Sequence, residues 1–249
     1  GGRKIEDVLM QASALLAGGD AEAAERELER ALALDPGAAG PLSALTALLR
    51  RQGRAEQAEN LLQIALSRRG RRPQLLTMLG DNLLEQKELP NAALAAERAY
   101  REASPEAAPF APALLALARL YERQARPADE LLALEAALPV APDPVPLWLR
   151  VGRLQAARGD GPEARYAYER VLAEQPESAE ALAELARVHA ALLAQPLAAH
   201  ELAERAYGLA PELPSVIGTF GWILLQQGHL DTALPLLREA AAAQPTSGE

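Results

Sequence analysis

Residues 145–178 read "VPLWLRVGRLQAARGDGPEARYAYERVLAEQPES", and this stretch decides the fold. It contains two runs of helical length, separated by Gly159 and Asp160 and closed by Pro176. Proline stops a helix because it lacks a backbone N–H and its ring clashes with the preceding turn. The stretch therefore predicts two short helices joined by a tight turn.

Gly152 stands inside the first predicted helix, where glycine costs about 1 kcal/mol of helix propensity relative to alanine. We expect this glycine at the point where the two helices cross, because a small residue lets them approach closely. Ala164 is the matching small residue on the second helix. Gly159 is expected to have a positive φ and to end the first helix.

The pattern recurs along the chain with a period of about 34 residues. Thirty-four residues separate Pro142 from Pro176, and 34 again separate Pro211 from Pro245. The small crossing residue of the second helix recurs as Ala24, Ala58, Ala92, Ala164, Ala199 and Ala233. A fixed period of this length is typical of stacked repeats.

Composition agrees with helices and excludes several classes of protein. Aromatic residues make up 4% of the 249 residues, and no stretch alternates apolar and polar residues as a strand would. The absence of cysteine excludes disulfides, thiolate zinc sites and cysteine nucleophiles. The net charge of −9 argues against non-specific nucleic-acid binding. No apolar run approaches the 18 or so residues of a membrane span.

The stretch 145–178 resembles the tetratricopeptide repeat (TPR) family. The residues that match the family's pattern are Trp148, Gly152, Gly159, Ala164, Tyr168 and Pro176. The resemblance extends over essentially the whole chain and implies an all-α, right-handed superhelical solenoid of seven helical hairpins. The predicted repeats are 5–38, 39–72, 73–106, 111–144, 145–178, 179–213 and 214–247.

Four features outside the pattern carry expectations of their own. Residues 1–4 are expected to be a cloning remnant outside the fold, and residues 107–110, "AAPF", an insertion between the third and fourth repeats. Glu130 stands where the crossing alanine of the fourth repeat should be, so its carboxylate is expected to reach solvent or a partner. No capping helix follows Pro245, which favours a segment of a longer repeat protein or end-to-end self-association.

The family commonly binds peptides on the concave surface formed by its first helices. At about 100° per residue, positions 2, 5, 6, 9, 12 and 13 of each repeat face that surface. The candidate partner-binding residues at these positions are Arg50, Arg51, Arg119, Arg123, Arg150, Arg153, Arg187 and Trp222. Two interpretations of the arginines remain open: a site for an acidic partner, or solvated side chains partly neutralised by Glu122, Glu180 and Glu184. Trp222 either anchors a ligand or covers the end of the core.

Catalysis, a cofactor and a metal site are not expected. His189, His200 and His229 are isolated in the sequence, and no HExxH, phosphate loop or GxSxG motif occurs. TPR co-chaperones hold acidic tails with lysines and asparagines at set groove positions. The asparagines here are Asn60, Asn82 and Asn91, and none falls on a groove position. The run "SRRGRR" at 67–72 is interpreted as a solvated turn rather than a nucleic-acid patch.

The sequence therefore predicts a non-catalytic scaffold that binds another protein or peptide, acidic in character, in its groove. A weaker resemblance, in repeat style and in "GWILLQQGHLDTALPLLREA" at 221–240, is to the TPR regions of bacterial exopolysaccharide biosynthesis and export proteins. That resemblance implies a bacterial protein, favours the periplasm over the cytoplasm and adds an anionic polysaccharide as a partner. A self-assembling structural array and a glycan-associated module remain open alternatives.

Overall fold

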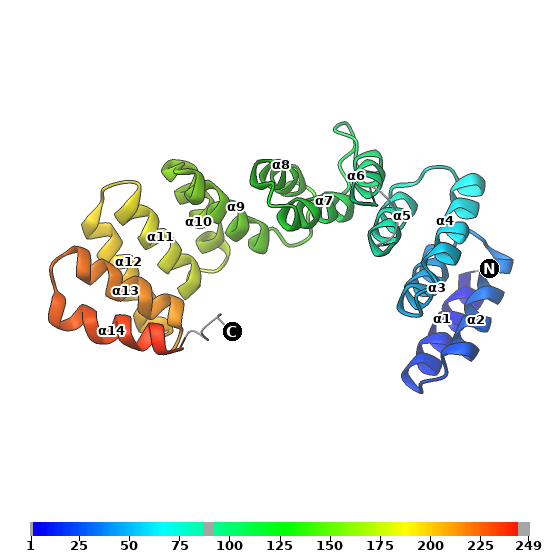
Figure 1. The fold of residues 1–249 in the computed structure, drawn as a ribbon, viewed down its shortest axis with the longest axis horizontal. Coiled ribbons are helices and arrows are strands. Elements are labelled where there is room, and N and C mark those ends of the chain that lie inside the picture. The colour runs from blue at the N-terminus through cyan, green and yellow to red at the C-terminus, as the bar shows by residue number, and fades with distance from the viewer. Residues whose placement is uncertain (1, 87–91, 244–249) are drawn as a thin grey trace. The chain divides into compact units, whose positions relative to one another are not determined.

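A computed structural model describes residues 2–86 and 92–243. Every regular element in these ranges is an α-helix (Figure 1). The helices are α1 (Gly2–Ala17), α2 (Ala21–Leu34), α3 (Ala39–Arg51), α4 (Ala55–Arg69), α5 (Pro73–Glu85), α6 (Ala92–Ala103), α7 (Ala111–Arg123), α8 (Pro127–Ala137), α9 (Val145–Arg158), α10 (Gly161–Glu174), α11 (Ala179–Ala191), α12 (Pro196–Leu209), α13 (Pro214–Gln226) and α14 (Leu230–Ala243). The all-helical prediction is confirmed.

The helices form two compact units, residues 1–140 and residues 141–249. Unit 1 holds α1–α8 and unit 2 holds α9–α14. Within each unit every helix packs against the next along the chain, and the first helix of a hairpin also packs against the first helix of the following hairpin. These contacts are those of stacked helical hairpins (Figure 1).

The first helices after α1 begin at residues 39, 73, 111, 145, 179 and 214, where six of the predicted repeats begin. Residues 2–4 are the first turn of α1, so the expectation that they lie outside the fold was wrong. The end of the seventh predicted repeat, 244–247, lies outside the described residues. A single solenoid over 5–247 stays a prediction.

Left-handed residues end most first helices, as the sequence suggested for Gly159. Gly159 has a φ of +84°, and Gly19, Gly53 and Gly228 have the same conformation in the corresponding turns. Ala125 takes this role in the fourth hairpin with a φ of +53°. An L-residue tolerates this region poorly because its Cβ crowds the backbone, so the hairpin geometry overrides the local preference there.

Every second helix except α8 crosses its partner with a fully buried alanine. These alanines, all 0% exposed, are Ala24, Ala58, Ala96, Ala164, Ala199 and Ala233. In the third hairpin the crossing residue is thus Ala96 and not Ala92, which is only partly buried. The four residues beyond the 34-residue period therefore lie between α5 and Ala96.

Residues 107–110 are accordingly not an insertion, and that prediction was wrong. Counted from the crossing alanine of the second helix, residues 107–110 in the link between α6 and α7 correspond to residues 175–178 in the link between α10 and α11. A period measured over whole hairpins cannot show whether extra residues precede or follow the second helix. The burial of Ala96 resolves this.

Glu130 keeps the crossing position of α8 but is only 3% exposed. Of the two alternatives expected for its carboxylate, solvent or a partner, solvent is therefore excluded. A buried carboxylate is tolerated where other groups of the chain interact with it, and Glu130 has such an interaction. α8 still packs against α7 as in the other hairpins.

Arginines at the start of two second helices join consecutive hairpins of unit 1. Arg54 precedes α4 and bonds Glu25 of α2 at 2.8 Å, and Arg126 precedes α8 and bonds Glu97 of α6 at 3.0 Å. Both glutamates directly follow a crossing alanine. The same pair of repeat positions thus forms the same contact twice.

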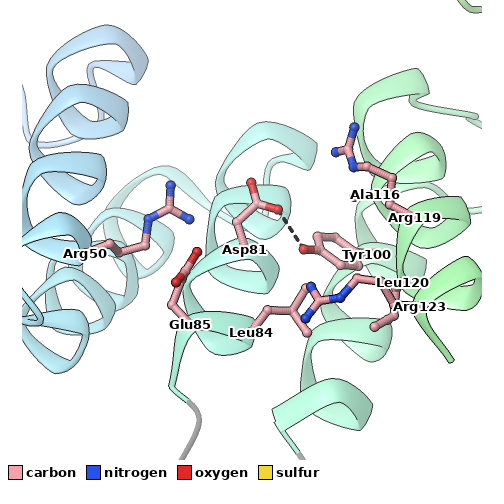
Figure 2. Close-up of a pocket in the computed structure, with 9 residues that line it drawn as sticks. All are labelled: Arg50, Asp81, Leu84, Glu85, Tyr100, Ala116, Arg119, Leu120 and Arg123. Carbon is pink, nitrogen blue, oxygen red and sulfur yellow. Dashed lines mark hydrogen bonds between the residues drawn. The ribbon is translucent and has the colours of Figure 1, made fainter. Parts of the chain in front are cut away.

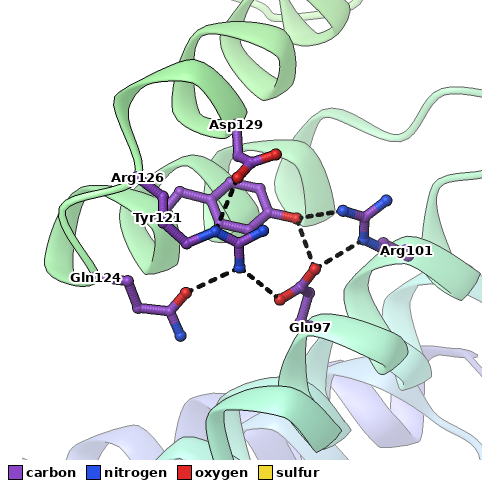
Figure 3. Close-up of polar contacts among 6 residues, drawn as sticks. All are labelled: Glu97, Arg101, Tyr121, Gln124, Arg126 and Asp129. Atoms are coloured by element: carbon purple, nitrogen blue, oxygen red, sulfur yellow. Dashed lines mark hydrogen bonds and ion pairs between the residues drawn. The ribbon is translucent and has the colours of Figure 1, made fainter.

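Glu97 is the centre of the larger of these two networks (Figure 3). Its carboxylate also accepts hydrogen bonds at 3.1 Å from the Tyr121 hydroxyl and from Nε of Arg101. Burial raises the pKa of Glu97, but the hydrogen bonds from Arg126 and Tyr121 and the charge of Arg126 outweigh it and lower the pKa overall. The ionised carboxylate therefore stabilises the contact between the third and fourth hairpins.

Replacing Glu97 with glutamine is expected to lower the free energy of unfolding by about 1–3 kcal/mol at pH 7. Because the folded-state pKa of Glu97 lies below its ordinary value, its contribution is complete above that ordinary value. It is lost as the pH falls through the lowered one. Urea unfolding at pH 7 and pH 3 measures the loss, with the exposed Glu106→Gln as control. An equal loss at both pH values would contradict the role of the ionised form.

Candidate functional site

A pocket of about 390 Å³ lies on the first helices of unit 1 (Figure 2). Arg50 of α3 lines it on one side, and Arg119 and Arg123 of α7 line it on the other. Asp81 of α5 and Tyr100 of α6 lie between them. Three of the predicted groove arginines, far apart in the sequence, thus surround one pocket.

Tyr100 belongs to a second helix but reaches this pocket by crossing α5 at Gly80. A Cβ at Gly80 would lie only 2.4 Å from Cε1 of Tyr100. The tyrosine is fully buried, and its hydroxyl donates a 2.7 Å hydrogen bond to Oδ1 of Asp81. Burial, and next the bond to Asp81, raise the pKa of Tyr100, so the phenol stays protonated and donates.

Gly152 plays the same part in unit 2. A Cβ there would lie 2.7 Å from Cε1 of Tyr168, which is also fully buried. The glycine therefore makes room for a tyrosine ring, rather than for the close approach of two helix backbones that the sequence suggested. The sequence signal for both pocket tyrosines is this combination of glycine in the first helix and tyrosine in the second.

The arginines around the unit 1 pocket are unpaired among the described residues, whereas one of its two acidic residues is already hydrogen-bonded. Among the described residues, no carboxylate lies within ion-pair distance of Arg50, Arg119 or Arg123. Of the two acidic residues that line the pocket, Asp81 already accepts the bond from Tyr100, and Glu85 is exposed. Three guanidinium groups thus face two carboxylates, and the pocket can accept an anionic group.

A second pocket, of about 330 Å³, lies at the equivalent place in unit 2. Counted from the start of each first helix, Arg153 stands at the position of Asp81 and Arg187 at that of Arg119. Tyr168 takes the place of Tyr100, and all three residues line the pocket together with Glu184. The two pockets are therefore the same feature of the hairpin stack, lined with different charges.

The predicted groove arginines of unit 2 are engaged in ion pairs. Arg153 pairs with Glu180 and, at 3.5 Å, with Glu184, while Arg187 lies 3.8 Å from Glu184. Arg150 also has an interaction partner. Pairs of this exposure contribute about 0–1 kcal/mol each, and here they neutralise the arginines. Arg51, on α3, is exposed and is not among the residues that line the unit 1 pocket.

Both tryptophans are partly buried by contacts with other side chains. Trp222 of α13 is half-buried and packs against the cluster that contains Ile223 and Ala199. Trp148 is likewise half-buried and meets Tyr166 edge-on, with ring centroids 5.7 Å apart. The contacts of Trp222 are those of a residue that covers the core, and its use as a ligand anchor stays a prediction.

Two of the histidines weighed for catalysis lie within hydrogen-bond distance of glutamine side chains. His189 lies 2.7 Å from Gln195, and His200 of α12 lies 2.8 Å from Gln227 of the next hairpin. Within 2–86 and 92–243, no group of three histidine, aspartate or glutamate residues could hold a metal ion. No helix in the same ranges is long and apolar enough to cross a membrane. Asn91, one of the asparagines weighed for a carboxylate clamp, lies outside the described residues.

Stacked hairpins with polar pockets on their first helices define an α-helical repeat protein. The chain belongs to the tetratricopeptide repeat family: two of the family's models, both described as tetratricopeptide repeat, match residues 15–81 and 149–214, together just over half of the chain. Proteins of this family generally act as scaffolds for protein–protein interaction.

Solved structures agree with this fold. The C-terminal part of a TPR protein from Cytophaga hutchinsonii is 12% identical, with 96% of each chain covered and a TM-score of 0.68. PilF of Pseudomonas aeruginosa is 19% identical over 86% of this chain and 95% of its own, with a TM-score of 0.58. MamA is 18% identical over 71% and 98%, with a TM-score of 0.55. At these identities the likeness concerns the fold alone.

No curated protein matches the chain. None of the three structures just described is named for exopolysaccharide biosynthesis or export. The weaker resemblance drawn from the sequence thus receives no support from them.

Proposed function

We propose that this protein is a non-catalytic scaffold that binds an acidic segment of a partner protein in the unit 1 pocket. The observation that carries the proposal is the convergence of Arg50, Arg119 and Arg123 on one pocket without an ion-pair partner among the described residues. The planar guanidinium fork matches a carboxylate and can bind it through two parallel hydrogen bonds. Arginines on α3 and α7 are placed to grip a segment that crosses α5.

Tyr100 supports this assignment by holding Asp81. The 2.7 Å hydrogen bond from its hydroxyl engages one carboxylate oxygen of Asp81, so this acid is less free to pair with the arginines. A neutral glycan is a poorer occupant, because sugars stack on exposed aromatic faces. The only aromatic residue that lines the pocket in the part of the chain described is Tyr100, which is fully buried.

The test compares two triple variants with the same change in charge. Arg50→Glu/Arg119→Glu/Arg123→Glu reverses the pocket, while Arg98→Glu/Arg170→Glu/Arg238→Glu reverses three exposed arginines on second helices. The probe is a fluorescein-labelled glutamate decapeptide, followed by anisotropy at low and moderate salt. We expect the pocket variant to bind at least about tenfold more weakly than wild type, because reversed charges repel the acidic probe. The control should bind close to wild type.

Equal weakening in both variants would show a net-charge effect, and unchanged binding in the pocket variant would show that the arginines are only solvated. Either result overturns the proposal. The anionic polysaccharide and the self-assembling array are outcomes of the same test. Polygalacturonate that binds where the decapeptide does not would favour the first. Concentration-dependent oligomers that form equally in the wild type and in the pocket variant would favour the self-assembling array.

A further inference from the structure

The two equivalent pockets differ in what their tyrosine hydroxyl meets. In unit 1 the hydroxyl of Tyr100 donates to Asp81 at 2.7 Å. In unit 2 the position of Asp81 is taken by Arg153, which carries no acceptor. The hydroxyl of Tyr168 is buried, and no described group accepts its hydrogen bond. A buried hydroxyl left in this state destabilises the fold, because it has lost its hydrogen bonds to water without a replacement.

The groups around Tyr168 show what would satisfy it. Burial, and next the negative charge of Glu184, raise the pKa of Tyr168, while Arg153 and Arg187 act in the opposite sense. The phenol therefore remains protonated and has a hydrogen to donate. Two guanidinium groups line the same pocket, so the acceptor that fits is negatively charged.

Glu184 is the carboxylate that lines this pocket, but it does not accept a hydrogen bond from Tyr168. It lies 3.5 Å from Arg153 and 3.8 Å from Arg187, and it makes no hydrogen bond with Tyr168. Unlike Asp81, it comes from the following first helix, α11. Glu184 therefore forms ion pairs with the two arginines and leaves the hydroxyl of Tyr168 without a hydrogen bond.

We propose that the unit 2 pocket binds one carboxylate side chain of an acidic partner segment, which accepts the hydrogen bond of Tyr168 and replaces Glu184 as the ion-pair partner of Arg153. The bound carboxylate takes the place that the Asp81 carboxylate holds in unit 1. Because the hydroxyl is covered, side chains that line the pocket must change rotamer as the ligand enters. This site is separate from the unit 1 pocket and shares no residue with it.

Binding is tested in the full chain with the unit 1 pocket silenced by Arg50→Glu/Arg119→Glu/Arg123→Glu. The probe is the labelled glutamate decapeptide, with a glutamine decapeptide as its neutral counterpart. Residual glutamate-specific binding is expected, and Tyr168→Phe should weaken it about tenfold. Glu184→Gln should strengthen it, because the resident competitor loses its charge. Tyr166→Phe is the matched control, since Tyr166 is exposed on the same helix and does not line the pocket.

The proposal is overturned if no residual binding remains, or if Tyr168→Phe and Tyr166→Phe change binding equally. Both results concern unit 2 alone and leave the unit 1 pocket to its own test. Thermal unfolding gives a readout without ligand. Tyr168→Phe removes an unbonded hydroxyl and should leave Tm unchanged or raise it, whereas Tyr100→Phe removes a formed bond and should lower it. If both variants lower Tm equally, the hydroxyl of Tyr168 already has an acceptor and the inference fails.

Discussion

Replacing Gly80 with alanine is expected to lower the free energy of unfolding by about 1–3 kcal/mol, although alanine is the better helix former by about 1 kcal/mol. The added Cβ would lie 2.4 Å from Cε1 of Tyr100, well inside van der Waals contact. The tyrosine is fully buried and its hydroxyl is bonded to Asp81, so the ring has little room to move. Urea unfolding followed by circular dichroism measures the effect.

The double variant Gly80→Ala/Tyr100→Leu is expected to recover most of the loss. The fourth hairpin already carries this pair at the same repeat positions, as Ala118 and Leu134, and both are buried. Gly208→Ala is the control, because a Cβ at Gly208 meets no atom within 4 Å. This change should stabilise the protein by up to about 1 kcal/mol. If Gly80→Ala were equally stabilising, the ring would not fill the space above Gly80.

Leu182→Ala should cost unit 2 about 2–5 kcal/mol of its free energy of unfolding, toward the upper part of that range. Leu182 is 0% exposed and packs in a cluster with Ala179, Ala183 and Ala206. The cluster also contains Ala210 and Val216, with Leu172, Leu202 and Tyr207 packed against it. The alanines cannot extend into the space that the leucine leaves, so the longer side chains close the cavity only in part. Both tryptophans lie in unit 2, and the fluorescence transition in urea therefore reports this loss.

Leu197→Ala is the matched control for that measurement. Leu197 lies in the same unit but is 79% exposed, so its truncation should change the free energy of unfolding by less than about 0.5 kcal/mol. Similar midpoints for the two variants would mean that unit 2 closes around a missing leucine. The cluster around Leu182 would then be less tightly packed than its burial indicates.

The hairpin period could be predicted from sequence because it rests on proline, glycine and alanine at fixed positions. Pro142, Pro176 and Pro211 each lie in the link that follows a second helix, where a residue without a backbone N–H ends the helix. The position of the four extra residues in the third hairpin could not be predicted this way. Ala92 and Ala96 are both alanines, and only their burial distinguishes the crossing residue.

The site was partly predictable for a similar reason. Helical phase alone places Arg50, Arg119 and Arg123 on one surface, because each lies on a first helix with a regular register. It cannot show which arginines are neutralised, since Arg153 meets Glu180 across 27 residues of sequence. It also missed Tyr100 and Tyr168, which reach the first-helix surface from the second helices by crossing a glycine.

The matching of Gly80 to Tyr100, and of Gly152 to Tyr168, limits how such a gene can be recombined. A crossover within the turn of a hairpin would join the first helix of one repeat to the second helix of another. The exchange of α9 for α7, for instance, would place Ala118 beneath the ring of Tyr168. Breakpoints in the links between hairpins keep each glycine with its tyrosine. Duplication, deletion and shuffling of repeats, in nature or by design, should therefore proceed by whole hairpins in this array.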